Sequence, residues 1–220
     1  MKRRSLPVAA VLAATAALLL TACGSEDEKS SDNDKIAGAD VGDGGGEAKA
    51  STSPSPSQDV DRPDLSLPSD VKEVFEDWKT GDATKDAVLK DAGFSMTAVS
   101  RAITDSDAKS PALSFYYKGT ALVDAVEWVQ TFVDNDASIT GAIRYYSPTV
   151  SLSGNKTAAV TLCADESKAF NKFLKTNKVD RSAPSDNSYV YYVSRLTLNA
   201  KGVWITTESI SKRGSEKCTP

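Results

Sequence analysis

The 220-residue chain contains no histidine, and that absence excludes much of the commonest chemistry of active sites. A Ser-His-Asp triad needs an imidazole as its base, and catalytic zinc sites commonly use histidine ligands. The sequence also lacks a Gly-rich phosphate-binding loop and a CxxC redox pair. We therefore predict no catalytic residues, no metal site and no cofactor.

The chain has only three cysteines, an odd number, so one of them must do something other than pair within the chain. Cys23 follows basic residues at positions 2–4 and an apolar run at positions 8–20, the pattern of a secretory signal. The run is too short to span a bilayer, which takes about 20 residues. The sequence LTAC at positions 20–23 resembles the lipobox of bacterial lipoproteins, which implies cleavage before Cys23 and a lipid on its thiol. We therefore predict a signal peptide at 1–22 and a lipid-anchored protein on the extracytoplasmic face of the cell membrane.

The next segment, residues 24–64, has almost no large apolar side chains and is rich in acids, glycine, serine and proline. Such a composition cannot bury enough surface to offset the entropy of ordering, so we predict that 23–64 is a disordered linker behind the lipidated cysteine. The chain carries a net charge of −4, and the linker holds a surplus of acids, which leaves residues 65–220 close to neutral. A neutral domain has no basic footprint for nucleic acid, and we expect none as a partner.

Cys163 and Cys218 remain once Cys23 is assigned to the lipid. Because the compartment outside the membrane permits disulfides, an even pair is expected to bridge there. In the chain-entropy model, closing a loop of about 56 residues stabilises a fold by about 4 kcal/mol. No histidine is available to activate either thiol, so we predict a structural disulfide.

Residues 65–220 are long enough for one domain with a sizeable core, and their first half has helical periodicity. Apolar residues spaced by three and four predict helices over 69–81, 84–103 and 119–132. Pro111 is expected to break the chain between the second helix and the third.

The second half of the domain alternates between apolar and polar residues, which is typical of strands. Turn residues at 154–155 and 199–202 separate the strands, and the polar segment 168–188 is expected to be a protruding hairpin or loop. We predict strands over 138–152, 157–165, 189–198 and 203–210. Helices followed by antiparallel strands predict an α+β domain, with the helices packed on one face of the sheet.

This order of elements resembles the NTF2-like superfamily, in which a curved antiparallel sheet and three N-terminal helices form a cone with a pocket. More specifically, the segments ITGAIRYYSP, VTLCADESKAF, KTNKV and GVWIT, which lead to a near-terminal cysteine, resemble a group of secreted actinobacterial lipoproteins. The resemblance implies that Cys163 and Cys218 pair. The superfamily includes isomerase-like and cyclase-like enzymes, ligand carriers and assembly modules, so the fold does not settle the function. Members of the superfamily often dimerise through the sheet, so a homodimer remains one of the alternatives for this chain.

Aromatic residues are the candidates for a binding site in such a cone. Four of them could line its mouth and hold a small apolar ligand: Trp128, Tyr145, Tyr191 and Trp204. The alternative is that these side chains fill the cone completely, and Trp128 stands at a helix position that is normally part of a core. We predict a non-catalytic domain that binds a small apolar ligand or an envelope partner.

Two other functions remain open. In a scaffolding module of the cell envelope, the basic segment Lys168–Arg181 could contact wall polymer or a partner protein, although a solvated charged surface explains it as well. In a ketosteroid-isomerase-like enzyme, a carboxylate such as Asp124 would serve as the base. The three functions predict different structures. A carrier needs an open apolar cavity, a scaffold has a filled cone and an exposed apolar patch, and an enzyme has a carboxylate facing a tyrosine in its pocket.

Overall fold

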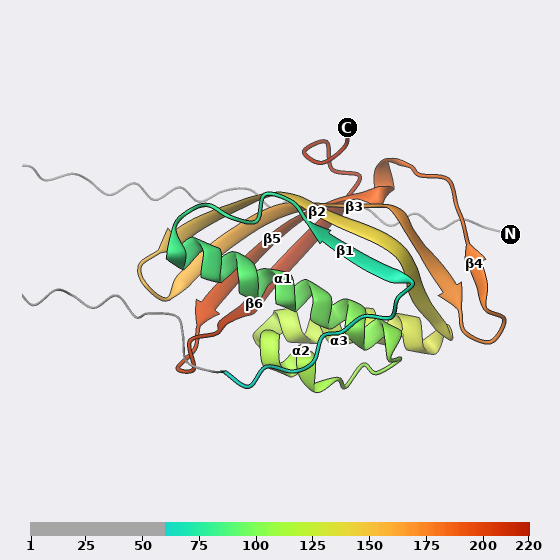
Figure 1. The fold of residues 1–220 in the computed structure, drawn as a ribbon, viewed down its shortest axis with the longest axis horizontal. Helices are drawn as coiled ribbons and strands as arrows, with labels where there is room; N and C mark the ends of the chain where they lie inside the picture. Colours follow the sequence, from blue (N-terminus) through green and yellow to red (C-terminus); the bar gives the residue numbers. More distant parts are fainter. Residues whose placement is uncertain (1–59) are drawn as a thin grey trace, which may run out of the picture. The chain divides into compact units, whose positions relative to one another are not determined.

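A curved sheet of six strands, with three α-helices against one of its faces, forms the described part of the chain (Figure 1). The computed structural model describes residues 60–220, so the predicted signal peptide, Cys23 and most of the predicted linker lie outside the described residues. The elements in chain order are β1 (Val71–Phe75), α1 (Ala83–Thr104), α2 (Pro111–Tyr116), α3 (Gly119–Asp134), β2 (Ala137–Ser153), β3 (Thr157–Phe173), β4 (Lys178–Asp180), β5 (Tyr189–Leu198) and β6 (Trp204–Arg213). The predicted α+β architecture, with helices on one face of a curved and mainly antiparallel sheet, is confirmed.

The strand β1 stands where the first helix was predicted, so that prediction is wrong. Its backbone pairs in parallel with β2, from Val71 opposite Gly141 to Phe75 opposite Tyr145. The valines of this segment favour an extended backbone, and the Phe75 ring stacks on the Tyr145 ring with centroids 5.0 Å apart. The apolar spacing that predicted one face of a helix therefore serves an edge strand instead.

The other two predicted helices are confirmed as α1 and α3. The helix α1 begins one residue before the predicted Thr84, because the Asp82 carboxylate caps it and accepts the backbone N–H groups of Thr84 and Lys85 at 2.9 Å. A short third helix, α2, begins at Pro111, where only a break was predicted, since proline fits the first turn of a helix. Among residues 60–220, no helix is long and apolar enough to cross a membrane.

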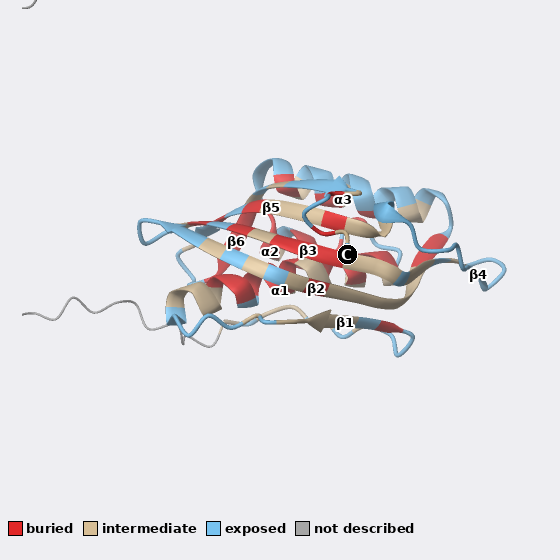
Figure 2. Cartoon of the chain, turned by 90° about the horizontal axis from the view of Figure 1, so that it is seen from above, coloured by how far each residue is buried: buried red, intermediate tan, exposed pale blue. Residues whose placement is uncertain are grey.

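The strands form two long hairpins, as predicted. β2 and β3 pair antiparallel around the turn after Ser153, and β5 and β6 pair around residues 199–202. The order across the sheet is β1-β2-β3-β5-β6, and β4 pairs with the far end of β3. Figure 2 shows buried residues along the central strands, whereas the outer side of α3 and the tip at β4 are exposed.

The polar segment 168–188 is a protruding hairpin, as predicted (Figure 1). β3 continues to Phe173, and after a turn β4 returns antiparallel to it, with Phe173 opposite Lys178. Two basic residues of this hairpin pair with acids of the domain: Lys172 lies 2.9 Å from Asp70, and Lys175 pairs with Asp136. Two of the five basic residues between Lys168 and Arg181 are therefore neutralised by acids of the domain.

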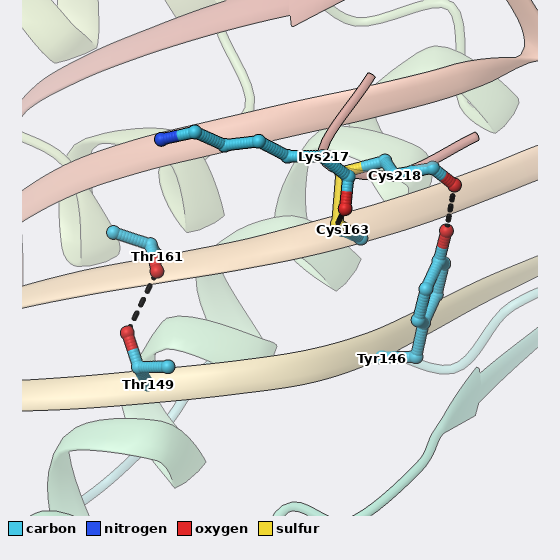
Figure 3. Close-up of a disulfide and its surroundings, with 6 residues drawn as sticks. All are labelled: Tyr146, Thr149, Thr161, Cys163, Lys217 and Cys218. Atoms are coloured by element: carbon cyan, nitrogen blue, oxygen red, sulfur yellow. Dashed lines mark hydrogen bonds between the residues drawn. A yellow bond between two sulfur atoms is a disulfide. The ribbon is translucent and has the colours of Figure 1, made fainter. Parts of the chain in front are cut away.

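The predicted disulfide between Cys163 and Cys218 is confirmed (Figure 3). Cys163 lies on β3 opposite Tyr146 of β2 and Tyr191 of β5, and these three residues share the face of the sheet that points away from the helices. The Tyr146 hydroxyl donates a hydrogen bond to the carbonyl oxygen of Cys218. The bridge thus holds the C-terminal segment against the outer face of the sheet.

The ordered domain begins before residue 65, so the predicted end of the linker at residue 64 is too late. Val60 packs against the core, and Arg62 forms an ion pair of 2.7 Å with the buried Asp91 of α1. The Arg62 guanidinium also lies over the Phe94 ring, 5.2 Å from its centroid. The composition of residues 60–64 did not predict this order, because the ion pair of Arg62 depends on a partner in a distant helix.

Candidate ligand-binding cavity

A cavity of about 800 Å³ lies between the helices α1 and α3 and the inner face of the sheet. Its size is within the range typical of small-molecule sites, roughly 300–1,000 Å³. Residues of β2, β3, β5, β6 and the segment 182–188 complete its wall. The aromatic residues of the domain therefore leave a hollow instead of filling the cone.

The apolar part of the wall comes from two helices and two strands, and β3 contributes Ala169, Phe170 and Phe173. Met96, Val99 and Ile103 follow one another at intervals of three and four along α1, so they share one face of that helix. Phe132 contributes from α3, and the two isoleucines of β2, Ile139 and Ile143, contribute from the sheet. These side chains can surround a flexible or flat apolar body without offering it hydrogen bonds.

The polar part of the wall centres on an ion pair between strands. Arg213, at the end of β6, places its Nη1 atom 2.6 Å from Oε2 of Glu166 on β3, and it also donates to the carbonyl oxygen of Asn187 at 3.2 Å. Burial alone would lower the pKa of Arg213, but the charge of Glu166, the hydrogen bond to it and the nearby Tyr192 together outweigh burial and hold that pKa above its usual value. Arg213 therefore stays charged beside Glu166, and both side chains line the cavity.

Tyr192 lies next to this pair, on β5 opposite Ser211 of β6. Burial, and then the negative charge of Glu166, raise the pKa of the Tyr192 hydroxyl well above its usual value. Among residues 60–220 this hydroxyl has no hydrogen-bond partner. A ligand in the cavity can therefore use it as both donor and acceptor.

A second polar group stands behind the opposite wall. The Glu73 carboxylate of β1 accepts hydrogen bonds from Thr97 at 2.6 Å and from Ser100 at 2.7 Å, and the Tyr145 hydroxyl lies 3.5 Å from it. Burial raises the pKa of Glu73, and these hydroxyl donors offset only part of that rise. Ser100 and Tyr145 line the cavity, whereas Glu73 lies behind them.

The structure brings only two of the four predicted site residues to the cavity. Trp128 lines it from α3 and is 45% exposed, so it is not the core residue that its helix position suggested, and Tyr145 lines it from β2. Tyr191 lies on the outer face of the sheet beside Lys217, and Trp204 is buried in the core. The prediction that these last two line the cavity is wrong.

The error at Tyr191 is one of strand parity. Alternation places Val190, Tyr192 and Leu196 on the inner face and Tyr191 with Arg195 on the outer one. Arg195 is the signal in the sequence that could have shown which face of the strand is exposed. A charged side chain is expected on the outer face, and Tyr191, four positions away, lies on the same face. Trp204 stands at the start of β6, where its backbone N–H donates to the buried Asp91 at 2.8 Å and its ring joins the core.

The site residues that sequence reasoning missed are Glu166, Arg213, Tyr192 and Glu73. Glu166 and Arg213 are 47 positions apart, and only the pairing of β3, β5 and β6 brings them together. Asp124, considered as a base, is exposed on α3 at the rim of the cavity. Within the described part of the chain, no cluster of three or more cysteine, aspartate or glutamate residues could hold a metal ion.

No protein-family model and no curated protein matches this chain. Among solved structures, it is similar to a ketosteroid isomerase-like protein from Erwinia carotovora atroseptica SCRI1043, with 16% identity over 59% of this chain and 95% of that one and a TM-score of 0.41. It is also similar to the intermembrane space region of the chloroplast protein ARC6, with 13% identity, coverage of 61% and 98%, and a TM-score of 0.39.

Proposed function

We propose that the domain is a non-catalytic binding module of the NTF2-like kind, which holds a small and mainly apolar molecule in the cavity between helices and sheet. The observation that carries this proposal is the cavity itself: about 800 Å³ in volume, walled by apolar side chains of α1, α3 and β2, with a few polar groups at one end. A module that only bound another protein would not need this hollow.

In this proposal, the N-terminal segment determines where in the cell the domain binds its ligand. Cys23 carries a lipid, the signal peptide is removed, and the linker holds the domain near the extracytoplasmic face of the membrane. Two observations support the placement, namely the lipobox-like LTAC sequence and the Cys163–Cys218 disulfide, which suits an oxidising compartment. The anchored domain then encounters a poorly water-soluble ligand at the membrane surface.

One observation favours a second candidate, an enzyme that moves a proton on a bound ketone. A carboxylate and a tyrosine do face each other, at the 3.5 Å contact of Glu73 and Tyr145. However, Thr97 and Ser100 already donate to the two oxygens of Glu73, and the group stands behind the wall. Binding therefore remains the better supported function. Deuterium loss beside the carbonyl of a bound ketone, abolished by Glu73→Gln, would favour the enzyme.

The binding function can be tested with two substitutions on β6, one that fills the cavity and a matched control that does not. Ser211 lines the cavity, whereas its neighbour Lys212 lies opposite Tyr191 on the outer face, and both are exposed. Ser211→Trp should fill the polar end of the cavity, and Lys212→Trp should leave the cavity unchanged. Both are made in the full chain with Cys23→Ser, so that no detergent is needed to keep a lipid anchor in solution.

The measurement is isothermal titration calorimetry with dodecyl amphiphiles below their critical micelle concentrations. We expect at least one of them to bind saturably at one molecule per chain, to bind the Lys212→Trp variant equally, and to fail with Ser211→Trp. Absence of saturable binding, or equal binding to both tryptophan variants, would contradict the proposed cavity function.

A further inference from the structure

The polar end of the cavity presents a neutralised pair of charges to whatever enters. Glu166 and Arg213 use one oxygen and one nitrogen on each other, at 2.6 Å. Within residues 60–220, the second carboxylate oxygen of Glu166 and the remaining guanidinium nitrogens of Arg213 have no hydrogen-bond partner. An acceptor and a donor therefore stand side by side, with almost no net charge between them.

Tyr192 adds an uncharged group to the same end of the cavity. Its hydroxyl stays protonated at neutral pH, and it is free to donate or to accept. Ser211 lies opposite it on β6 and lines the cavity as well. The polar end thus offers a mixture of donors and acceptors, which suits a hydroxyl group because a hydroxyl does both.

Charged head groups fit this end poorly. An anion placed against Arg213 also lies against Glu166, and the other two charged residues of the wall, Asp124 and Asp180, are acids as well. A cation placed against Glu166 lies against Arg213, which already neutralises that carboxylate. Asp124 and Asp180 are exposed, so water and salt weaken their hold on a cation. Either charged head would also lose its hydration on entry, which costs more than burying a hydroxyl that finds partners.

From this arrangement we propose that the ligand is an amphiphile with an apolar body and an uncharged, hydroxyl-bearing head, and that Glu166, Arg213 and Tyr192 determine this specificity. The head's hydroxyl donates to the free oxygen of Glu166 and accepts from Arg213 or Tyr192. The apolar body lies along the isoleucines of β2 and the facing side of α1. This inference rests on the proposed function and adds the chemical class of the ligand.

The test compares three probes that share a dodecyl chain and differ in head group: n-dodecyl β-D-glucoside, dodecanoate and dodecyltrimethylammonium. Each is titrated below its critical micelle concentration into the full chain carrying Cys23→Ser. We expect the glucoside to bind about tenfold or more tightly than either charged probe, since a hydrogen bond to a charged group contributes that much.

Variants then assign the selectivity to the three residues. Glu166→Gln leaves Arg213 unneutralised, so it should strengthen dodecanoate and weaken the glucoside, and Arg213→Gln should strengthen dodecyltrimethylammonium. Tyr192→Phe removes one oxygen with little change in shape and should weaken only the glucoside, by about five- to tenfold. Ile143→Val, the control, should weaken all three probes alike.

The outcomes separate this inference from the function it rests on. If no dodecyl probe binds, the proposed cavity function itself is wrong. Equal affinities of all three probes, or an unchanged ranking in Glu166→Gln and Arg213→Gln variants that keep the wild-type circular dichroism spectrum, would overturn the head-group specificity while leaving the cavity function standing.

Discussion

The guanidinium of Arg62 lies 2.7 Å from the Asp91 carboxylate, measured from Nη1 to Oδ1, and so ties the first described residues to the middle of α1. Asp91 is almost fully buried and also accepts the backbone N–H of Trp204 on β6. One carboxylate thus joins the N-terminal segment, a helix and the sheet. Its charge is tolerated because Arg62 neutralises it.

Replacing Arg62 with methionine should therefore destabilise the domain by about 3 kcal/mol, because a buried carboxylate loses its partner while the apolar stem is kept. Urea denaturation measures this loss. The control is Arg195→Met, whose partner Glu208 lies 3.4 Å away with both side chains about 60% exposed, so the cost should stay below about 1 kcal/mol. Equal costs at the two positions would contradict the role given to Asp91.

The disulfide should be a major source of stability, since it closes a loop across a sequence separation of 55 residues. In the chain-entropy model, reduction should cost about 4 kcal/mol. Urea denaturation with and without a reductant measures the difference, and the Cys163→Ala/Cys218→Ala variant should not respond to the reductant. A wild-type chain equally stable in both conditions would show that the C-terminal segment is held by other contacts.

Alternation and turn chemistry were sufficient to predict the four long strands, β2, β3, β5 and β6, and the two hairpins that they form. The ends of β2 and β3 meet at the turn expected at Gly154, and the helix α3 begins at the expected Gly119. These signals are local, because each of them can be read from a short stretch of neighbouring residues. The same approach did not predict the strand β1, because this five-residue strand depends on pairing with a partner strand 70 positions away.

The candidate site depended even more on distant pairing. Position 192 differs from the predicted 191 by a single step, which moves a side chain to the other face of a strand. The contact of Glu166 with Arg213 requires three strands in register, and no periodicity in the sequence reports it. The sequence therefore shows which residues could take part in binding or catalysis, but it does not show which of them come into contact in the fold.

The buried Glu73 should make stability depend on pH. Because burial raises its pKa in the folded protein, the folded state binds the proton more tightly than the unfolded chain, so stability falls as pH rises from about 4.5 through the folded pKa. Glu73→Gln removes this loss, and its gain over the wild type should grow with pH, by about 1.4 kcal/mol for each unit by which the pKa is raised.

Urea midpoints of both proteins between pH 4.5 and 8 test this expectation. Asp91, whose pKa burial also raises, contributes with the same sign in both proteins and cancels in the comparison. A difference between wild type and Glu73→Gln that stays constant with pH would mean that the folded pKa of Glu73 is not raised.

Gly141 should be intolerant of a side chain. It has a φ of +97°, and an added Cβ would clash with the backbone carbonyl oxygen of Lys168 at the irregular pairing of β2 with β3. Gly141→Ala should cost more than about 3 kcal/mol, from the strained backbone and the forced shift of two strands.

The control for that substitution is Gly154→Ala. Gly154 also has a positive φ, +68°, but nothing lies within 4 Å of the added carbon, so only the strain of about 1–2 kcal/mol remains. Thermal denaturation of both variants gives the comparison. If Gly154→Ala proved as costly as Gly141→Ala, the clash with Lys168 would not explain the result.

Nuclear magnetic resonance can show whether a dodecyl chain binds inside the proposed cavity or on the surface of the protein. With isoleucine methyl groups labelled in the full chain carrying Cys23→Ser, Ile103, Ile139 and Ile143 report on the cavity, and Ile210, which is 70% exposed on the outer face, reports on surface adsorption. We expect nuclear Overhauser effects from the methylenes of n-dodecyl β-D-glucoside to the three cavity isoleucines and none to Ile210. Effects confined to Ile210, with the cavity methyl signals unchanged, would contradict binding in the proposed cavity.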